Sequence, residues 1–319
     1  MSKLEQRIAD GDVIVIDGAM GTELQRRGVP MHRVAWSAAA IASHPETIRE
    51  VHEDYIRAGA ELVIANTFGT ARHVLAQAAL GERVEELNRR AVELAKEARD
   101  AAAEGREVLI AGSISSFMPE NAKDKHVMPD VAVGSYKEQA EILAAAGVDL
   151  IALEMMQDVA YTAYALEAAL ATGLPVWVGF SCRLEETGKR VLTFRDDVDA
   201  SFADTVSKVM SMGGSLAGVM HSDVEVVGPA LEVLRANWPG PMAAYPHSGH
   251  FIMPEWQFVD IISPEDLLAE AEKWVGQGAQ IIGGCCGIGP DHIRLLTERL
   301  PKRRPSDPST QSTSDSAAC

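Results

Sequence analysis

The chain has 319 residues, of which 47% are apolar, so it can bury a large core as one barrel or as two ordinary domains. Its 29 basic and 46 acidic residues give a net charge of −17, which argues against a general nucleic-acid-binding protein, because phosphate contacts need concentrated Lys and Arg. Four cysteines do not make a disulfide framework in a chain of this length. The N-terminus lacks an apolar signal region, and no run approaches the roughly 18 apolar residues of a membrane span. We therefore expect a soluble, reduced, cytoplasmic protein that contacts no membrane, and the sequence leaves open whether it forms a homo-oligomer.

Short apolar segments alternate with helical segments along the chain. The expected helices cover residues 45–58, 82–104, 135–146, 158–171, 199–212, 226–237 and 264–276, with another beginning at Pro290. The expected strands cover residues 13–16, 62–65, 108–111, 150–153, 176–180, 216–220, 242–245 and 280–282. Strands that alternate with helices indicate a parallel sheet, and eight such units predict a closed (β/α)8 barrel of the TIM type.

Three segments fall outside this alternation. Residues 117–134 and 183–198 are polar insertions after the third and fifth strands, and we expect them to be loops that cover the site. From Pro301 onward the chain is rich in Ser, Thr and Pro, which predicts a disordered tail. The expected organisation is one barrel domain over residues 1–300 and a tail over residues 301–319.

An adjacent pair of cysteines, Cys285 and Cys286, follows the last expected strand within Gly-Gly-Cys-Cys-Gly. Neighbouring strand residues point to opposite faces, so both sulfurs can reach one metal only if the chain turns there. The flanking glycines permit the backbone angles of such a turn. Two simple buried thiols and a strained vicinal disulfide are the alternatives. The position favours a metal, because strand-to-helix turns carry the active site in a parallel barrel.

Polar residues follow most of the other strands and would lie on the same rim of the barrel: Asp17, Asn66, Ser113, Glu154, His221 and His247. His221 with Cys285 and Cys286 would make a Cys2His zinc site with one open position, because soft sulfur ligands favour Zn²⁺ over Mg²⁺ or Ca²⁺. Taken alone, His221 is more typical of an ordinary surface or core histidine, and Asp17 of a turn residue. Asp17 and Glu154 together suit a substrate ammonium group, and general acid–base catalysis is the competing role.

Seven segments resemble the homocysteine S-methyltransferase family, in family order over residues 12–300. They are DGAMGTEL (17–24), WSAAAI (36–41), PETIREVHEDYIRAGAELVIANTF (45–68), AGSI (111–114), LE (153–154), YPHSG (245–249) and GGCCGIGPDHI (283–293). The resemblance implies a (β/α)8 barrel that holds zinc through three cysteines and methylates homocysteine to give methionine, a step of methionine biosynthesis. Substrate contacts are expected from Asp17, Gly18, Asn66, Ser113, Glu154, Tyr245 and His247.

The chain departs from the family pattern at two positions. The family's Asn-Cys at the end of the sixth strand is Met220-His221 here, so imidazole replaces the third thiolate. The family's Tyr-Pro-Asn-Ser-Gly-Glu becomes a segment with His247 and His250. Zinc with two thiolates and a neutral imidazole is formally uncharged, whereas three thiolates leave it at −1. This change should make a bound thiol more acidic and its sulfur a weaker nucleophile, and either effect could dominate. Cys182 is a less favoured source of a third sulfur.

The expected reaction is zinc-dependent methyl transfer from a sulfonium or quaternary ammonium donor to the homocysteine thiol. Residues 17–68 resemble the family members that use S-methylmethionine, which makes this the favoured donor. Aromatic side chains near the rim would hold the methylated cation, and the candidates are Trp36, Phe68, Phe117, Tyr245 and Trp256. Three alternatives stay open: a non-catalytic relative that binds a methylated amino acid or osmolyte, a zinc-assisted lyase or hydrolase with Glu154 as base, and methyl transfer to another acceptor.

Overall fold

A computed structural model describes residues 3–118, 127–195, 198–252 and 257–303. Eight strands form one sheet, and every pair of neighbours within it is parallel. In sheet order they are β1 (Ile14–Val15), β12 (Ala279–Ile282), β9 (Met242–His247), β8 (Leu216–Asp223), β5 (Val176–Phe180), β4 (Leu150–Met156), β3 (Leu109–Ser115) and β2 (Leu62–Ala65). The predicted strands are all present.

The two edges of this sheet meet and close it into a barrel. A parallel bridge joins Ile16, just after β1, to Leu62 in β2. The amide of Asp17 then donates to the carbonyl oxygen of Leu62 at 3.0 Å, and the amide of Glu61 donates to that of Val15 at 2.8 Å. The expected (β/α)8 barrel is confirmed.

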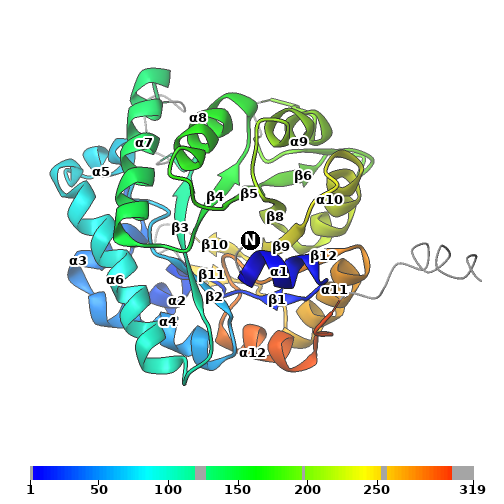
Figure 1. The fold of residues 1–319 in the computed structure, drawn as a ribbon, viewed down its shortest axis with the longest axis horizontal. Coiled ribbons are helices and arrows are strands. Elements are labelled where there is room, and N and C mark those ends of the chain that lie inside the picture. The colour runs from blue at the N-terminus through cyan, green and yellow to red at the C-terminus, as the bar shows by residue number, and fades with distance from the viewer. Residues whose placement is uncertain (1–2, 119–126, 196–197, 253–256, 304–319) are drawn as a thin grey trace, which may run out of the picture.

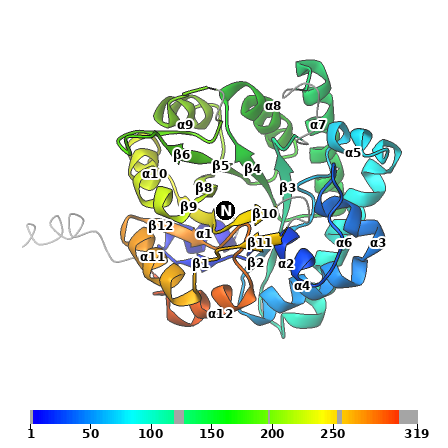
Figure 2. The ribbon, with the colours of Figure 1, turned by 180° about the vertical axis from the view of Figure 1, so that it is seen from behind.

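Helices surround the barrel on all sides (Figures 1 and 2). They are α2 (Gly21–Arg26), α3 (Ala40–Ser43), α4 (Pro45–Arg57), α5 (Arg72–Gln77), α6 (Val84–Ala102), α7 (Pro129–Ala146), α8 (Val159–Leu170), α9 (Phe202–Met210), α10 (Val224–Asn237), α11 (Pro264–Gly276) and α12 (Pro290–Arg299), with 3-10 turns at Ser37–Ala39 and Gly81–Arg83. One apolar layer packs between strands and helices, and a second fills the barrel interior, as alternation along each strand requires. No helix in the described ranges is both long enough and apolar enough to span a bilayer.

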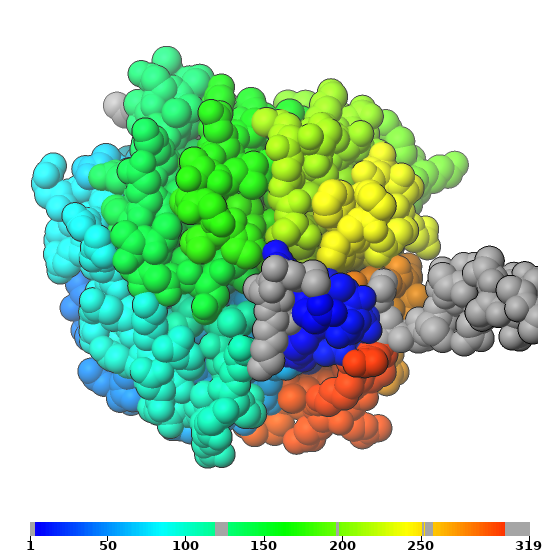
Figure 3. Space-filling model, viewed as in Figure 1, coloured from blue at the N-terminus to red at the C-terminus, as the bar shows by residue number. Residues whose placement is uncertain are grey.

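An additional helix, α1 (Lys3–Ala9), lies across the amino-terminal end of the barrel (Figure 3). Its Ile8 joins the interior apolar cluster, and Gln280 of β12 donates a hydrogen bond to the Ile8 carbonyl oxygen at 2.7 Å. This contact covers the barrel at the end away from the strand carboxyl termini, so the opposite rim is the open one.

The two polar insertions contain more regular structure than we expected. Helix α7 begins at Pro129 instead of residue 135, so the prediction of a loop through residue 134 is wrong. Proline is favourable in a first helical turn, but the exposed Val131 and Val133 obscure the amphipathic pattern there. The second insertion contains an antiparallel hairpin of β6 (Cys182–Leu184) and β7 (Val191–Thr193). Another hairpin, β10 (His250–Ile252) with β11 (Gln257–Val259), was not predicted.

The end of the described chain lies against its beginning. The amide of Val13 donates to the carbonyl oxygen of Lys302 at 2.9 Å, and Arg303 forms an ion pair with Asp12 at 3.1 Å. The remainder of the predicted tail, residues 304–319, lies outside the described residues, and the assignment of a disordered tail stays a prediction.

Candidate active site

The cysteine pair lies in a tight turn between β12 and α12. The amide of Cys285 donates to the carbonyl oxygen of Pro246 at 2.7 Å, and the carbonyl oxygen of Cys286 accepts from the amide of Ser248 at 3.0 Å. Gly287 has φ +84°, and a β-carbon there would collide with the backbone oxygen of Ser248. Glycine is therefore required at residue 287, because it alone combines this angle with so close an approach.

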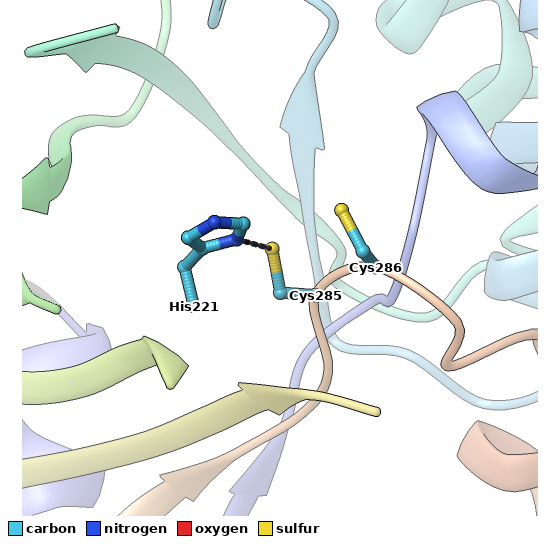
Figure 4. A group of neighbouring side chains, drawn as sticks. All are labelled: His221, Cys285 and Cys286. Carbon is cyan, nitrogen blue, oxygen red and sulfur yellow. Dashed lines mark hydrogen bonds between the residues drawn. The ribbon is translucent and has the colours of Figure 1, made fainter. Parts of the chain in front are cut away.

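This turn brings both sulfurs to the same side as the imidazole of His221 (Figure 4). His221 lies near the carboxyl end of β8, and its Nδ1 is 3.6 Å from the Sγ of Cys285. One ligand atom from each of His221, Cys285 and Cys286 lies within 4.8 Å of the other two. The structure thus assembles the three predicted metal ligands from two separate strand ends.

The donor set and its spacing fit zinc. Bonds of about 2.1 Å to nitrogen and about 2.3 Å to sulfur, at a tetrahedral angle, separate the two ligand atoms by about 3.6 Å. That value matches the distance between His221 Nδ1 and Cys285 Sγ. Two sulfurs and one imidazole are soft to borderline ligands, which favour zinc over magnesium or calcium. These three residues leave a fourth tetrahedral position for a substrate atom.

The pKa values of Cys285 and His221 are both shifted from their ordinary values. The hydrogen bond with Cys286, and after it burial, raise the pKa of the Cys285 thiol well above its ordinary value. Burial would lower the pKa of His221, but the hydrogen bond and charge of Cys285, followed by the charges of Glu154 and Asp223, raise it overall. A cation among these side chains would stabilise the thiolate forms.

Two buried carboxyl groups lie at the rim beside this group. Burial raises the pKa of Glu154 to about 7, against the opposing effects of the Ser113 hydroxyl that donates to it and of the His221 charge. Burial raises the pKa of Asp17 well above its ordinary value, and the charge of Glu154 adds to this. One Asp17 oxygen accepts from the amide of Ile64 at 2.8 Å, whereas Oδ1 is buried without a partner among the described residues. The pair is arranged to receive a cation that donates hydrogen bonds.

A cavity of about 820 Å³ joins the two groups. Gly18, Asn66 and Glu154 line it together with His221, Cys285 and Cys286. This volume lies within the roughly 300–1,000 Å³ typical of small-molecule sites. The cavity thus unites the proposed metal ligands with three of the predicted substrate contacts.

The other predicted substrate contacts are not among the described lining residues of this cavity. Asp17 and Ser113 support it through Glu154, as above. Tyr245 belongs to the interior apolar cluster of the barrel, and burial raises the pKa of its phenol well above the ordinary value. Nε2 of His247 lies 2.8 Å from a carboxylate oxygen of Asp223, and the His247 ring centroid lies 4.9 Å from that of His221. Direct substrate contacts by these residues stay predictions.

Aromatic side chains form one wall of the cavity. Trp36 and Phe68 meet edge to face with centroids 6.0 Å apart, and Phe68 and Phe117 are 5.5 Å apart. All three line the cavity, as predicted for a cation-binding surface. Of the two remaining candidates, Tyr245 lies in the barrel interior and Trp256 falls outside the described residues.

Several supporting residues escaped the sequence analysis. Thr22 Oγ1 accepts from the amide of Gly287 at 3.1 Å and so braces the cysteine turn. The Tyr55 hydroxyl lies 2.8 Å from the carbonyl oxygen of Ala19 and 3.0 Å from that of Ile288, which ties the first rim loop to the last. Phe194 packs against His221 with centroids 5.4 Å apart. Thr22 falls within the DGAMGTEL segment, but no spacing rule connects any of these residues to the rim.

Comparison with known proteins decides the family. The profile described as Homocysteine S-methyltransferase matches residues 14–300. The chain belongs to the homocysteine S-methyltransferase family. It is 30% identical to Homocysteine S-methyltransferase 4 of Zea mays, covering 91% of this chain and 90% of that one. It is also 30% identical to the Homocysteine S-methyltransferase of Escherichia coli (strain K12), with coverages of 90% and 95%, and to a Selenocysteine methyltransferase of Astragalus bisulcatus, with 91% and 93%.

Solved structures lead to the same family. The metallated form of the homocysteine methyltransferase MmuM from Escherichia coli superimposes with a TM-score of 0.76 at 27% identity, covering 94% of this chain and all of that one. This S-methyltransferase family member therefore shares its barrel with an enzyme that was crystallised with metal. The resemblance expected from the cysteine turn and the DGAMGTEL segment is confirmed.

Proposed function

We propose that this enzyme transfers a methyl group from a sulfonium or quaternary ammonium donor to the thiol of homocysteine, giving methionine, with Zn²⁺ held by His221, Cys285 and Cys286. S-methylmethionine is the favoured donor. The observation that carries the proposal is the joint presence, in one cavity, of a Cys2His ligand group and a buried carboxyl at residue 154. An amino acid with a side-chain thiol complements both parts at once.

Zinc in this site would supply the means of deprotonating the substrate thiol, which is otherwise a poor nucleophile at neutral pH. The protein's residues would then orient the acceptor. The Glu154 carboxylate would accept hydrogen bonds from the substrate ammonium, and Asp17 would add negative charge beside it. Fixing the ammonium and the sulfur at two points leaves one direction of approach for the methyl group.

The rest of the cavity suits a donor that carries both a methylated cation and a carboxylate. Trp36, Phe68 and Phe117 present aromatic surface, which attracts sulfonium or quaternary ammonium groups. Arg33 also lines the cavity, is exposed, and makes no ion pair with the part of the chain that the structure describes. A guanidinium at this position would pair with a substrate carboxylate. Amino-acid donors such as S-methylmethionine, as well as betaine, meet both requirements.

Zinc analysis of the purified enzyme, followed by a donor panel, tests the proposal. Homocysteine would be incubated with S-methylmethionine, betaine or dimethylsulfoniopropionate, and methionine would be quantified. We expect about stoichiometric zinc and the fastest turnover with S-methylmethionine. Zinc-containing enzyme that forms no methionine from any donor would overturn the proposal. Because one relative is named for selenocysteine, selenocysteine is included as a second acceptor, and exclusive methylation of selenium would reassign the substrate.

A further inference from the structure

Strand β8 is irregular where it carries His221. Its pairing with β9 runs from Met220 opposite Tyr245 to Asp223 opposite His247, so three steps along β8 match two along β9. His221, within this extra step, has φ +43°. One additional residue on one strand is a β-bulge, a feature that redirects a side chain from the face it would otherwise occupy. The bulge is therefore what determines the direction of the His221 imidazole.

The bulge is held at two places beyond His221. The hydroxyl of Ser222 accepts from the amide of Cys182 at 2.9 Å and donates to the carbonyl oxygen of Met220 at 2.9 Å. One residue further on, a carboxylate oxygen of Asp223 lies 2.8 Å from Nε2 of His247. This second contact is a side-chain link across the two strands at the point where their register resumes.

The same link places a second ring beside the ligand. The centroids of His221 and His247 are 4.9 Å apart, with the rings inclined by 54°. Phe194 lies 5.4 Å from His221 and 6.3 Å from His247, so the three rings are in mutual contact. The His221 ring is thus restrained by neighbours while its Nδ1 faces the Cys285 sulfur.

Residues 221, 223 and 247 are consequently one structural unit. We infer that Asp223 and His247 form a positioning pair that fixes the β8 bulge and the ring beside it, and thereby aims the His221 imidazole at the cysteine sulfurs. The inference rests on the proposed zinc centre. It assigns no substrate contact to His247.

The Asp223→Ala variant tests the positioning pair. Its zinc affinity is measured on the full-length protein by competition with a chromogenic chelator. We expect the variant to bind zinc roughly ten-fold more weakly, since loss of a group that orients a metal ligand typically costs 10–100-fold. Asp223→Asn keeps an oxygen that accepts from His247 Nε2 and should stay close to the wild type. His250→Ala is the matched control, because it removes the exposed His250–Asp260 pair of the same rim, whose partners lie 3.5 Å apart.

A double-mutant cycle distinguishes positioning from a general effect on folding. In a His221→Ala background, Asp223→Ala should cause no further loss of zinc affinity, because its effect passes through the missing ring. The absorption spectrum of the cobalt-substituted protein should also change in Asp223→Ala toward that of His221→Ala, and be unchanged in His250→Ala. Equal zinc affinity of wild type and Asp223→Ala, or an equal loss in both backgrounds, would overturn the positioning pair alone. A wild-type protein that binds no zinc would instead overturn the metal centre on which the pair depends.

Discussion

Two walls of the cavity carry ionisable side chains. His221, Cys285 and Cys286 form the first, and Glu154 with Asp17 behind it forms the second. Both walls are rich in groups that become anionic, and in both the pKa of a buried acidic group is raised, that of the Cys285 thiol and that of the Glu154 carboxyl. In each wall, a bound cation would favour the anionic form of these groups.

The difference between the walls lies in which positive charge each accepts. Sulfur and imidazole ligands at tetrahedral spacing suit a soft metal ion, which binds as a lasting part of the site. Carboxylate oxygens suit an ammonium group, which hydrogen-bonds and leaves with each substrate. Under the proposed function, the first wall would hold a resident zinc ion and the second would bind the ammonium group of each incoming substrate. The predictions below remove or alter each wall in turn.

Loss of a sulfur ligand should have the largest effect. We expect Cys285→Ser to bind zinc more weakly by roughly 100-fold or more, because even changes in outer partners of a ligand cost 10–100-fold. Metal analysis after gel filtration and the initial rate of methionine formation measure the outcome. Cys319→Ser is the control, since it removes a thiol from the end of the chain and leaves both the ligand group and Ser222 unchanged. Full zinc content in Cys285→Ser would contradict the assignment of Cys285 as a zinc ligand.

Neutralising the carboxylate wall should spare the metal and weaken the acceptor. We expect Glu154→Gln to retain zinc but to have a lower kcat/KM for homocysteine, equivalent to a loss of about 2–5 kcal/mol of transition-state stabilisation, which is the usual effect of breaking a buried charged hydrogen bond. Steady-state kinetics with varied homocysteine measure this. Glu138→Gln removes a carboxylate of α7 that pairs with Arg72 outside the cavity, and it should behave as wild type. An unchanged kcat/KM in Glu154→Gln would show that the substrate ammonium group does not bind Glu154.

The pH profile should separate the two walls without removing a ligand. Because burial raises the pKa of Glu154 to about 7 in the substrate-free protein, the carboxylate form becomes dominant only above that pH. An ammonium group binds the carboxylate, so kcat/KM should fall by up to about ten-fold per pH unit below 7 and level off above it. Assays from pH 5.5 to 8.5 should show this decline in kcat/KM for the wild type, and the decline should be absent in Glu154→Gln. The same decline in the variant would show that another group titrates.

Introducing a third thiolate at residue 221 should produce the smallest change. We expect His221→Cys to keep zinc, with the bound homocysteine thiol less acidic by roughly one pKa unit, because a more negative site disfavours a further thiolate. Proton release on homocysteine binding, followed with a pH indicator at constant zinc content, measures the shift. Greater proton release by the variant than by wild type would contradict the charge argument.

The barrel and most of the residues in these two walls could be predicted from the sequence, because they depend on local patterns. Eight apolar runs separated by helical segments were sufficient to predict the barrel. Polar residues directly after the strands were sufficient to predict which rim carries the site. The three candidate metal ligands were expected from the strand exits and from the glycines around Cys285, and the structure brings them together. Local pattern and barrel geometry together brought residues 64 positions apart, His221 and Cys285, to one place.

The remainder depends on non-local packing, which spacing does not encode. Neither the start of α7 at Pro129 nor the hairpin within residues 183–198 has a clean apolar period. The bulge that redirects His221 arises from its register with β9. Likewise, Tyr245 lies in the barrel interior, where the absence of a side chain at Gly179 leaves room for its hydroxyl.

The two functional strand ends share a backbone feature with a thermodynamic consequence. Met155, beside Glu154 on β4, has φ +56°, and His221 on β8 has φ +43°, at the places where each strand loses its regular register. Non-glycine residues in such conformations cost roughly 1–3 kcal/mol each. The empty enzyme is therefore held below the stability that its barrel would otherwise reach. Each ligand that occupies the cavity should raise the free energy of unfolding by RT ln(1 + [L]/Kd), about 2.7 kcal/mol at a hundred-fold excess over Kd, and so raise the melting temperature.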